Sequence, residues 1–208
     1  IILKEKTSSQ DNIAPWLIEK WQHDWGMEKA ALICEEMIPY DDSSQTTRID
    51  LSTKYSMGAI SGTSEHQEKL QTLMTSLGDD CTLLPHGSIR VGQSLKGDVK
   101  MWPEYEDGTW WVQDASSALP ALVLTSALYD KHSKEDIPNL RVVDMRSAPG
   151  GKTSQLASAD FGHITAIEAS PRRSRRLKEN LERLGLLEKC EVVVQEGQHW
   201  LPPGKVHG

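Results

Sequence analysis

Short apolar runs alternate with helical segments from residue 140 to residue 197, and this alternation restricts the fold more than any other feature of the chain. The segments are LRVVDM (140–145), GGKTSQLASA (150–159), HITAIEA (163–169), SPRRSRRLKENLERLG (170–185) and CEVVVQEG (190–197). The fourth segment has clear helix boundaries, with Ser170 as N-cap, Pro171 at the first position and Gly185 after the last turn. The order strand, helix, strand, helix, strand predicts half of a doubly wound α/β domain with parallel strands.

The first hundred residues follow a different pattern and predict a small α+β subdomain. Apolar side chains at helical spacing in residues 14–37, interrupted by Gly26, predict two helices. Trp16, Trp21 and Trp25 follow the spacing of a buried stripe, so we interpret them as core residues, not as a platform for stacking RNA bases. Further segments predict strands at 46–53, 87–92 and 109–113 and helices at 64–78 and 114–128. We place the boundary near residue 100, which gives domains 1–100 and 101–208.

The segment VVDMRSAPGGKT (142–153) joins the first predicted strand of the second domain to its first helix. A phosphate loop of the type G-x-x-x-x-G-K-[ST] is excluded, because Arg146 stands where the first glycine is required. The dinucleotide fingerprint G-x-G-x-x-G is excluded as well, since Gly150 and Gly151 are adjacent. Two glycines before a helix N-terminus favour a ligand that approaches the backbone and carries a carboxylate. S-adenosylmethionine, which has a carboxylate and an adenosine, is the natural candidate.

Acidic residues at two successive strand ends support a cofactor site. Glu168 ends the second predicted strand, about twenty residues after the loop, where a carboxylate can accept both hydroxyls of a ribose. Glu196 ends the third strand, where a carboxylate could accept from the amino group of an adenine. Either glutamate alone would be interpreted as a solvated residue. Together, beside a glycine turn, they predict a nucleoside-binding edge of the sheet.

The composition is that of a globular protein and excludes several classes. Of 208 residues, 38% are hydrophobic, and no run of 18 apolar residues predicts a membrane span. Cys34, Cys81 and Cys190 form no C-x-x-C pair, so we expect no metal site and no disulfide framework. A net charge of −7 argues against broad non-specific binding of nucleic acid, but not against a local basic patch.

Three segments together resemble the Fmu/Sun branch of the NOL/NOP/Sun family of RNA cytosine-5 methyltransferases: WWVQDASSALPALVL, VVDMRSAPGGKTSQLA and IEASPRRSRRLKENLERLGL. The family's first motif usually reads D-x-C-A-A-P-G-G-K-T, and here it reads DMRSAPGGKT. The similarity continues more loosely upstream, through APWLIEKW and TRIDL. It implies a Rossmann-like methyltransferase domain that uses S-adenosylmethionine, preceded by an RNA-binding lead-in subdomain. The implied substrate is RNA, most like ribosomal RNA of the small subunit, with tRNA as the other candidate.

The resemblance also implies the cofactor-binding residues. They are Ala148, Pro149, Gly150, Gly151, Lys152, Glu168, Arg173 and Glu196. The turn 148–151 would hold the methionine end beside Lys152, Asp144 would support the turn, and Glu168 would bind the ribose. Glu196 stands where the family has an aspartate near the adenine. Arg146 and Ser147 replace the usual Cys-Ala pair, whose cysteine is not the family's nucleophile.

The resemblance places the catalytic cysteines outside this chain. Cytosine C5 becomes nucleophilic only after a thiolate adds to C6. The family supplies that thiolate from a Thr-Cys and assists release with a Pro-Cys after the fourth strand. Neither dipeptide occurs here, so we expect no catalytic residue within 1–208 and expect the cysteines downstream of residue 208. With the fourth strand also downstream, residues 141–145 would lack backbone partners on one side. The alternative is a non-catalytic module that binds S-adenosylmethionine or RNA.

Two further expectations concern the surroundings of the chain. The first residue is not a methionine, so we expect residues to precede it. The compartment would be the cytoplasm for a bacterial protein, and an organelle or the nucleolus for a eukaryotic one.

A basic cluster in the last predicted helix has two interpretations, a solvated face or a set of RNA phosphate contacts. Its members are Arg172, Arg173, Arg175, Arg176 and Lys178, opposite the core residues Leu177, Leu181 and Leu184.

Overall fold

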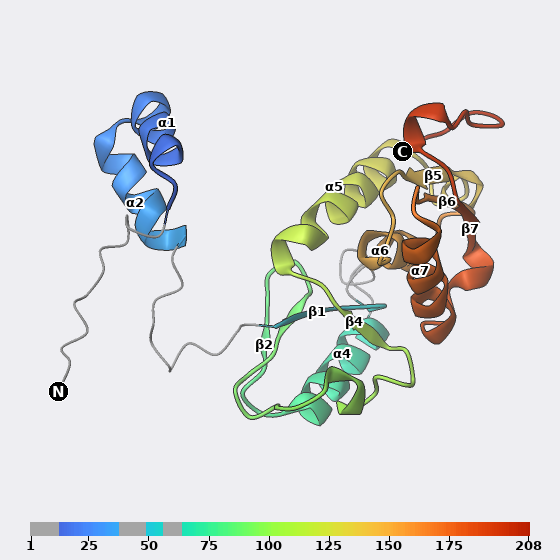
Figure 1. The fold of residues 1–208 in the computed structure, drawn as a ribbon. Coiled ribbons are helices and arrows are strands. Elements are labelled where there is room, and N and C mark those ends of the chain that lie inside the picture. Colours follow the sequence, from blue (N-terminus) through green and yellow to red (C-terminus); the bar gives the residue numbers. More distant parts are fainter. Residues whose placement is uncertain (1–12, 38–48, 56–63) are drawn as a thin grey trace. The chain divides into compact units, whose positions relative to one another are not determined.

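The computed structural model describes residues 13–37, 49–55 and 64–208, in two compact units, Ile1–Thr47 and Arg48–Gly208. The first unit contains two helices, α1 (Pro15–Trp25) and α2 (Met27–Met37), separated at Gly26 as predicted (Figure 1). Gly26 has a φ of +82°, a left-handed conformation that favours glycine.

The interpretation of the tryptophans of α1 as core residues is wrong for Trp16 and Trp25, and Trp21 is half-buried. Helix α1 has no buried residue, and the side chains of Trp16 and Trp25 are 65% and 60% exposed. Two eleven-residue helices offer little surface to enclose indole rings, and among their described side chains the buried ones are the small Ala30 and Cys34 of α2.

The second unit begins with a four-stranded antiparallel sheet in the order β2-β3-β1-β4. Its strands are β1 (Asp50–Thr53), β2 (Thr82–Leu83), β3 (Ile89–Arg90) and β4 (Trp110–Val112). Helix α4 (Ser64–Leu77) presents Leu70, Leu73 and Leu77 to its core, where Leu51 and Trp110 are buried. The predicted helix 64–78 and the predicted short strands are therefore confirmed over their described residues.

A three-stranded parallel sheet follows in the order β5-β6-β7. Its elements are α5 (Ala115–Lys131), β5 (Arg141–Asp144), α6 (Gly151–Ser158), β6 (His163–Ile167), α7 (Pro171–Arg183) and β7 (Cys190–Val193). Short 3-10 helices lie at Val99–Met101, Ile137–Asn139, Leu187–Lys189 and Gly197–His199. The side chain of Ser170 caps α7 by accepting from the backbone N of Arg173, and Gly185 follows its C-terminus with a φ of +63°. The prediction of a parallel α/β half-sheet is confirmed.

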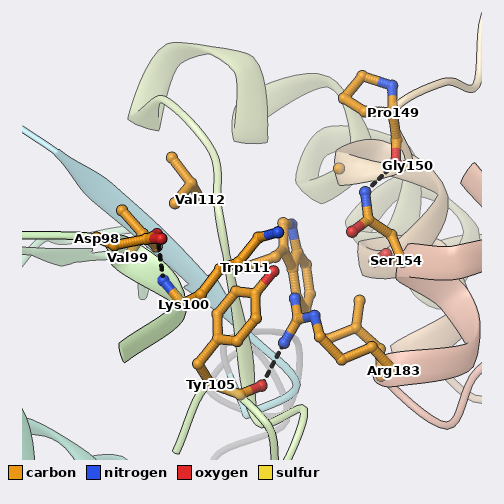
Figure 2. Close-up of a pocket in the computed structure, with 13 residues that line it drawn as sticks. Asp98, Val99, Lys100, Tyr105, Trp111, Val112, Pro149, Gly150, Ser154 and Arg183 are labelled. Carbon is orange, nitrogen blue, oxygen red and sulfur yellow. Dashed lines mark hydrogen bonds between the residues drawn. The ribbon is translucent and has the colours of Figure 1, made fainter. Parts of the chain in front are cut away.

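The antiparallel and parallel sheets are joined by polar contacts of α7 and by a buried amide network. The guanidinium of Arg183 donates to the backbone oxygens of Tyr105 (2.6 Å) and Trp110 (3.2 Å) and stacks on the ring of Tyr105 (Figure 2). Gln113 accepts from the indole N of Trp111 (2.7 Å) and donates to Oε1 of Gln155 in α6 (2.8 Å). The boundary at residue 100 stays a prediction, although the antiparallel sheet continues to β4 at 110–112.

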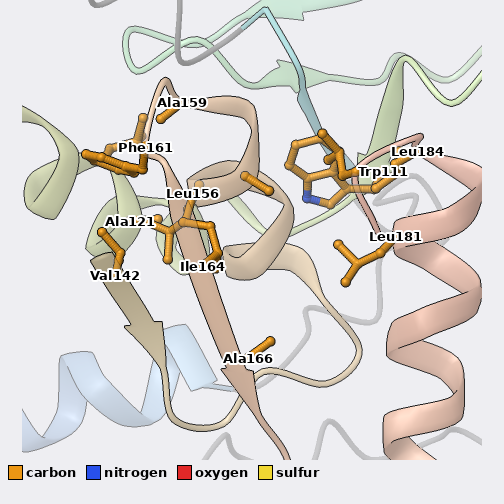
Figure 3. Packing of buried hydrophobic residues seen from close by; sticks show 14 of the residues in the cluster. Trp111, Ala121, Val142, Leu156, Ala159, Phe161, Ile164, Ala166, Leu181 and Leu184 are labelled. Carbon is orange, nitrogen blue, oxygen red and sulfur yellow. The ribbon is translucent and has the colours of Figure 1, made fainter. Parts of the chain in front are cut away.

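One hydrophobic core connects the parallel sheet to its helices. In the core shown in Figure 3, Val142 of β5 and Ile164 of β6 belong to one cluster with Leu156 of α6, Leu181 of α7 and Leu184, the residue after α7. Leu177, Leu181 and Leu184 are 0–1% exposed, so the apolar face predicted for α7 is confirmed. This packing fixes the helices on the sheet. It therefore also fixes both ends of the loops that connect strands to helices at the carboxyl-terminal edge of the sheet.

The outer edge of β5 carries hydrogen bonds from the last residues of the chain. His207 N donates to Arg141 O (2.9 Å), its Nδ1 accepts from Arg141 N (3.1 Å), and Val143 N donates to Gly208 O (2.7 Å). The expectation that this edge lacks partners is therefore wrong for Arg141 and Val143. Residues 207 and 208 lie on the side of β5 opposite to β6, where a further parallel strand would pair.

Candidate cofactor site

The turn after β5 is fixed by side chains of its own motif. Asp144 ends β5, and its carboxylate accepts from Arg146 N (3.3 Å) and from the hydroxyl of Thr153 in α6 (2.7 Å). Ser147 is buried, and both its backbone N and its hydroxyl donate to Ile167 O, at 3.2 and 2.9 Å. Ser147 thus attaches the turn to the end of β6, and Asp144 attaches it to α6, which is the supporting role expected for Asp144.

At both glycines of the turn, packing inside the protein leaves little room for a side chain. Gly150 has a φ of +116°, and a Cβ built there would lie 3.0 Å from Cδ1 of Leu177. A Cβ at Gly151 would lie 3.1 Å from Cδ of Gln113. The space left by both missing side chains is therefore taken by α7 and by the segment after β4.

Helix α7 binds the turn from its other side. Arg173 Nη2 donates to Ala148 O (2.7 Å), and Asn180 Nδ2 donates to Pro149 O (2.8 Å). Arg173 also lies opposite the carboxylate of Glu168, with 3.6 Å between Nη1 and Oε2. The backbone of the turn is thus held at a fixed place beside the end of β6.

A hollow of about 440 Å³ lies at the carboxyl-terminal edge of the parallel sheet. It is lined by Met145 and Arg146 after β5, Glu168, Ala169 and Arg173 after β6, and Glu196, Gly197 and Gln198 after β7. The three strand ends therefore contribute to one cavity, which is where ligands bind in open α/β sheets.

The two glutamates of the hollow differ in burial. Glu168 is 5% exposed, and its Oε1 accepts from Ser170 N (3.0 Å). Glu196 is exposed, and its Oε2 contacts Nε2 of Gln198 (2.9 Å) and Nδ1 of His199 (3.3 Å). A buried carboxylate with one close donor keeps acceptor capacity for hydroxyl groups, whereas an exposed one is partly satisfied by water.

The structure brings some of the expected site residues together and separates others. Glu168, Arg173 and Glu196 line the hollow, and Ala148 is bound by Arg173. Pro149, Gly150 and Gly151 line a second cavity of about 250 Å³ on the other side of the turn, between the turn and Tyr105, Trp111 and Arg183 (Figure 2). Lys152 is exposed on the first turn of α6.

Several residues of the site were not predicted. Asn180 and Ser147 hold the turn, and Met145 and Gln198 line the hollow. The polar Asn180 beside the leucine stripe of α7 was a usable signal, because a polar side chain next to a core face often bonds a neighbouring element. Over the described residues no group of three or more histidine, cysteine, aspartate or glutamate side chains could hold a metal ion, and no helix there is long and apolar enough to cross a membrane.

The parallel sheet and its helices define a Rossmann-like α/β fold, and solved structures share this fold. A methyltransferase homologue from Pyrococcus horikoshii aligns with a TM-score of 0.66 and 22% identity, over 94% of this chain and 58% of that one. NSun6 from the same organism, solved with SFG, aligns with a TM-score of 0.62 and 14% identity, over 89% and 66%.

Sequence comparisons find relatives among ribosomal RNA methyltransferases. Residues 133–202 match the model of the 16S rRNA methyltransferase RsmB/F family. A probable ribosomal RNA small subunit methyltransferase B from Synechocystis is 27% identical over 95% of the chain and 40% of its own length. Methyltransferase F from Shewanella denitrificans is 38% identical over 63% and 26%. The 25S rRNA (cytosine-C(5))-methyltransferase nop2 of Schizosaccharomyces pombe is 37% identical over 40% and 12%. The chain thus spans less than half the length of these relatives, and its resemblance to Sun-type RNA methyltransferases is confirmed.

Proposed function

We propose that this chain is the cofactor-binding part of an enzyme that transfers a methyl group from S-adenosylmethionine to C5 of a cytosine in RNA, with ribosomal RNA as the first candidate and tRNA as the second. The observation that carries the proposal is the buried carboxylate of Glu168 in a hollow at the strand ends, beside a turn of the family's first motif. The names of the relatives support the RNA class.

The residues of the hollow fit the proposed cofactor. Glu168 has acceptor capacity for ribose hydroxyls, and Glu196 at the next strand end can accept from an adenine amino group. Asp144, Thr153 and Ser147 hold the turn at which the methionine end would be placed. When bound, S-adenosylmethionine supplies an electrophilic methyl group. Residues 144–198 of this chain bind and orient it, and Lys152 is exposed on the first turn of α6.

The chain's own cysteines are poorly suited to supply the thiolate. Cys190 begins β7, at the edge of the sheet opposite to the hollow, and burial raises the pKa of its thiol to about 12. Cys81 precedes β2 in the antiparallel sheet, and Cys34 is 1% exposed in α2. We therefore place the catalytic cysteines outside residues 1–208. The same observation favours the second candidate, a module that binds the cofactor or RNA without catalysis.

Calorimetry with S-adenosylmethionine tests the cofactor assignment. Glu168→Ala should weaken binding by about 1–3 kcal/mol, the usual cost of leaving buried polar partners unpaired. Glu179→Ala is the matched control, because Glu179 is exposed on α7 and lies outside the hollow. Equal affinity of the unsubstituted chain for S-adenosylmethionine and for its 2′,3′-dideoxy analogue would show that Glu168 does not bind the ribose.

A further inference from the structure

Four charged side chains line the hollow, and three of them are already engaged. Glu168 accepts from Ser170 N, Arg173 donates to Ala148 O, and Glu196 is contacted by Gln198 and His199. The fourth, Arg146, is exposed, and no hydrogen bond or ion pair of its guanidinium is found among the described residues. The hollow therefore contains one uncommitted cation.

The order of the strands determines which part of a ligand this cation can meet. Glu168 follows β6, Glu196 follows β7, and Arg146 is the second residue after β5. A nucleoside with its ribose at Glu168 and its base towards Glu196 continues from its 5′ carbon in the opposite direction, towards the end of β5. In the proposed cofactor this continuation is an amino acid with a free carboxylate.

We infer that Arg146 binds the α-carboxylate of the cofactor's amino-acid part, an inference that rests on the proposed function. The guanidinium is permanently charged, and its planar donors match the two oxygens of a carboxylate. The turn itself offers the backbone of 148–151, but Gly150 and Gly151 face the second cavity. Arg146 occupies the position at which the family that this chain resembles has a cysteine. The contact would therefore be a specific property of the present chain.

The competing position for Arg146 is beside the sulfur. A cation near the sulfonium would repel S-adenosylmethionine but not S-adenosylhomocysteine, whose sulfur is neutral. A cation at the carboxylate would attract both equally. The compound 5′-methylthioadenosine keeps the nucleoside and has a neutral sulfur, but it has no amino-acid carboxylate. Its affinity should therefore not depend on Arg146 in either position. These three ligands therefore distinguish the two positions.

The test is calorimetry of the three ligands with the unsubstituted chain, Arg146→Ala and the control Arg175→Ala, which removes the same charge from an exposed site on α7 outside both cavities. We expect Arg146→Ala to weaken S-adenosylmethionine and S-adenosylhomocysteine by a common factor of about five to twentyfold, the value of an exposed charge-assisted contact. Binding of 5′-methylthioadenosine should stay unchanged, which also shows that the variant is folded. Arg175→Ala should bind all three ligands as the unsubstituted chain does.

Three results would overturn the inference. They are unchanged binding of all ligands, an equal loss for 5′-methylthioadenosine, and a gain for S-adenosylmethionine relative to S-adenosylhomocysteine. A failure of the proposed function looks different, since the unsubstituted chain itself would then bind neither S-adenosylmethionine nor S-adenosylhomocysteine.

Discussion

Asp50 connects three elements through one buried carboxylate. It lies in β1, accepts from Nε and Nη2 of Arg90 in β3 at 2.8 and 3.0 Å, and accepts from the backbone N of Ala115 at the start of α5 at 3.1 Å. Its side chain is 4% exposed, whereas that of Arg90 is 34% exposed. The hydrogen bonds from Arg90 lower the pKa of Asp50 below its ordinary value. The antiparallel sheet is thereby attached to the first helix of the α/β part.

Asp50→Asn should lower the free energy of unfolding at pH 7 by about 1.5–3 kcal/mol, the usual contribution of hydrogen bonds to a charged group. Because the pKa of Asp50 is lower in the folded state, its stabilisation is present above the ordinary pKa of 3.8 and is lost as pH falls through the lowered value. Urea unfolding of both proteins should show a difference that shrinks below about pH 4. The exposed Asp79→Asn is the control, and a difference that did not shrink as the pH fell below 3.8 would contradict the electrostatic account.

At the scale of elements, the predictions that succeeded depend on residues close together in the sequence. Ser170, Pro171 and Gly185 mark both ends of α7, and the apolar runs mark the strands. The conformation of the glycine turn depends instead on Leu177 and Gln113, which lie 27 and 38 residues away from Gly150 and Gly151. Contacts between distant residues leave no periodic signal in the sequence. For the same reason, the spacing of Trp16 and Trp25 could not show that their indole rings are exposed.

Helix α7 presents a row of exposed cations. Arg172, Arg175 and Arg176 are exposed, and over the described residues their side chains have no hydrogen bond or ion pair. Arg173 and Arg183 are engaged in holding the turn and in joining the two sheets, so they are not expected to contribute. The candidates for contacts with RNA phosphates are therefore Arg172, Arg175, Arg176 and Lys178.

Neutralising these three arginines with glutamine should flatten the salt dependence of RNA binding. If each arginine contacts a phosphate, the slope of log K against log salt should fall by about 0.7–0.9 for each lost contact. The triple Arg→Lys variant keeps the charge and is the control, with an unchanged slope. If the glutamine variant has the same slope as the unsubstituted chain, these arginines form a solvated helix face and do not contact phosphates.

At the scale of the whole molecule, the two sheets are joined by contacts between residues that are distant in the chain. Arg183 of α7 bonds Tyr105 and Trp110, which precede it by 78 and 73 residues, and Gln113 bonds Gln155, 42 residues later. The sequence predicted each sheet and the strand-end glutamates, because each depends on local patterns. It could not predict this junction, which brings buried amides and a guanidinium together from segments that are distant in the chain.

The final prediction concerns what the 208 residues can do alone. They should bind S-adenosylmethionine, but they should neither methylate ribosomal RNA nor form a covalent complex with it, because addition to C6 of cytosine needs a thiolate. Cys190, at the opposite edge of the sheet, keeps its proton at neutral pH because burial raises its pKa to about 12. The raised pKa also means that the contribution of Cys190 to the free energy of unfolding is full below its ordinary pKa of 9.0 and is lost as pH rises towards 12.

The measurement is transfer of labelled methyl to ribosomal RNA by this chain and by a longer chain that continues into further strands of the sheet. Transfer by the longer chain alone supports the enzyme, and binding without transfer by either supports the non-catalytic module. Transfer by the 208 residues, retained after each cysteine is changed to serine, would require a catalytic group other than a thiolate.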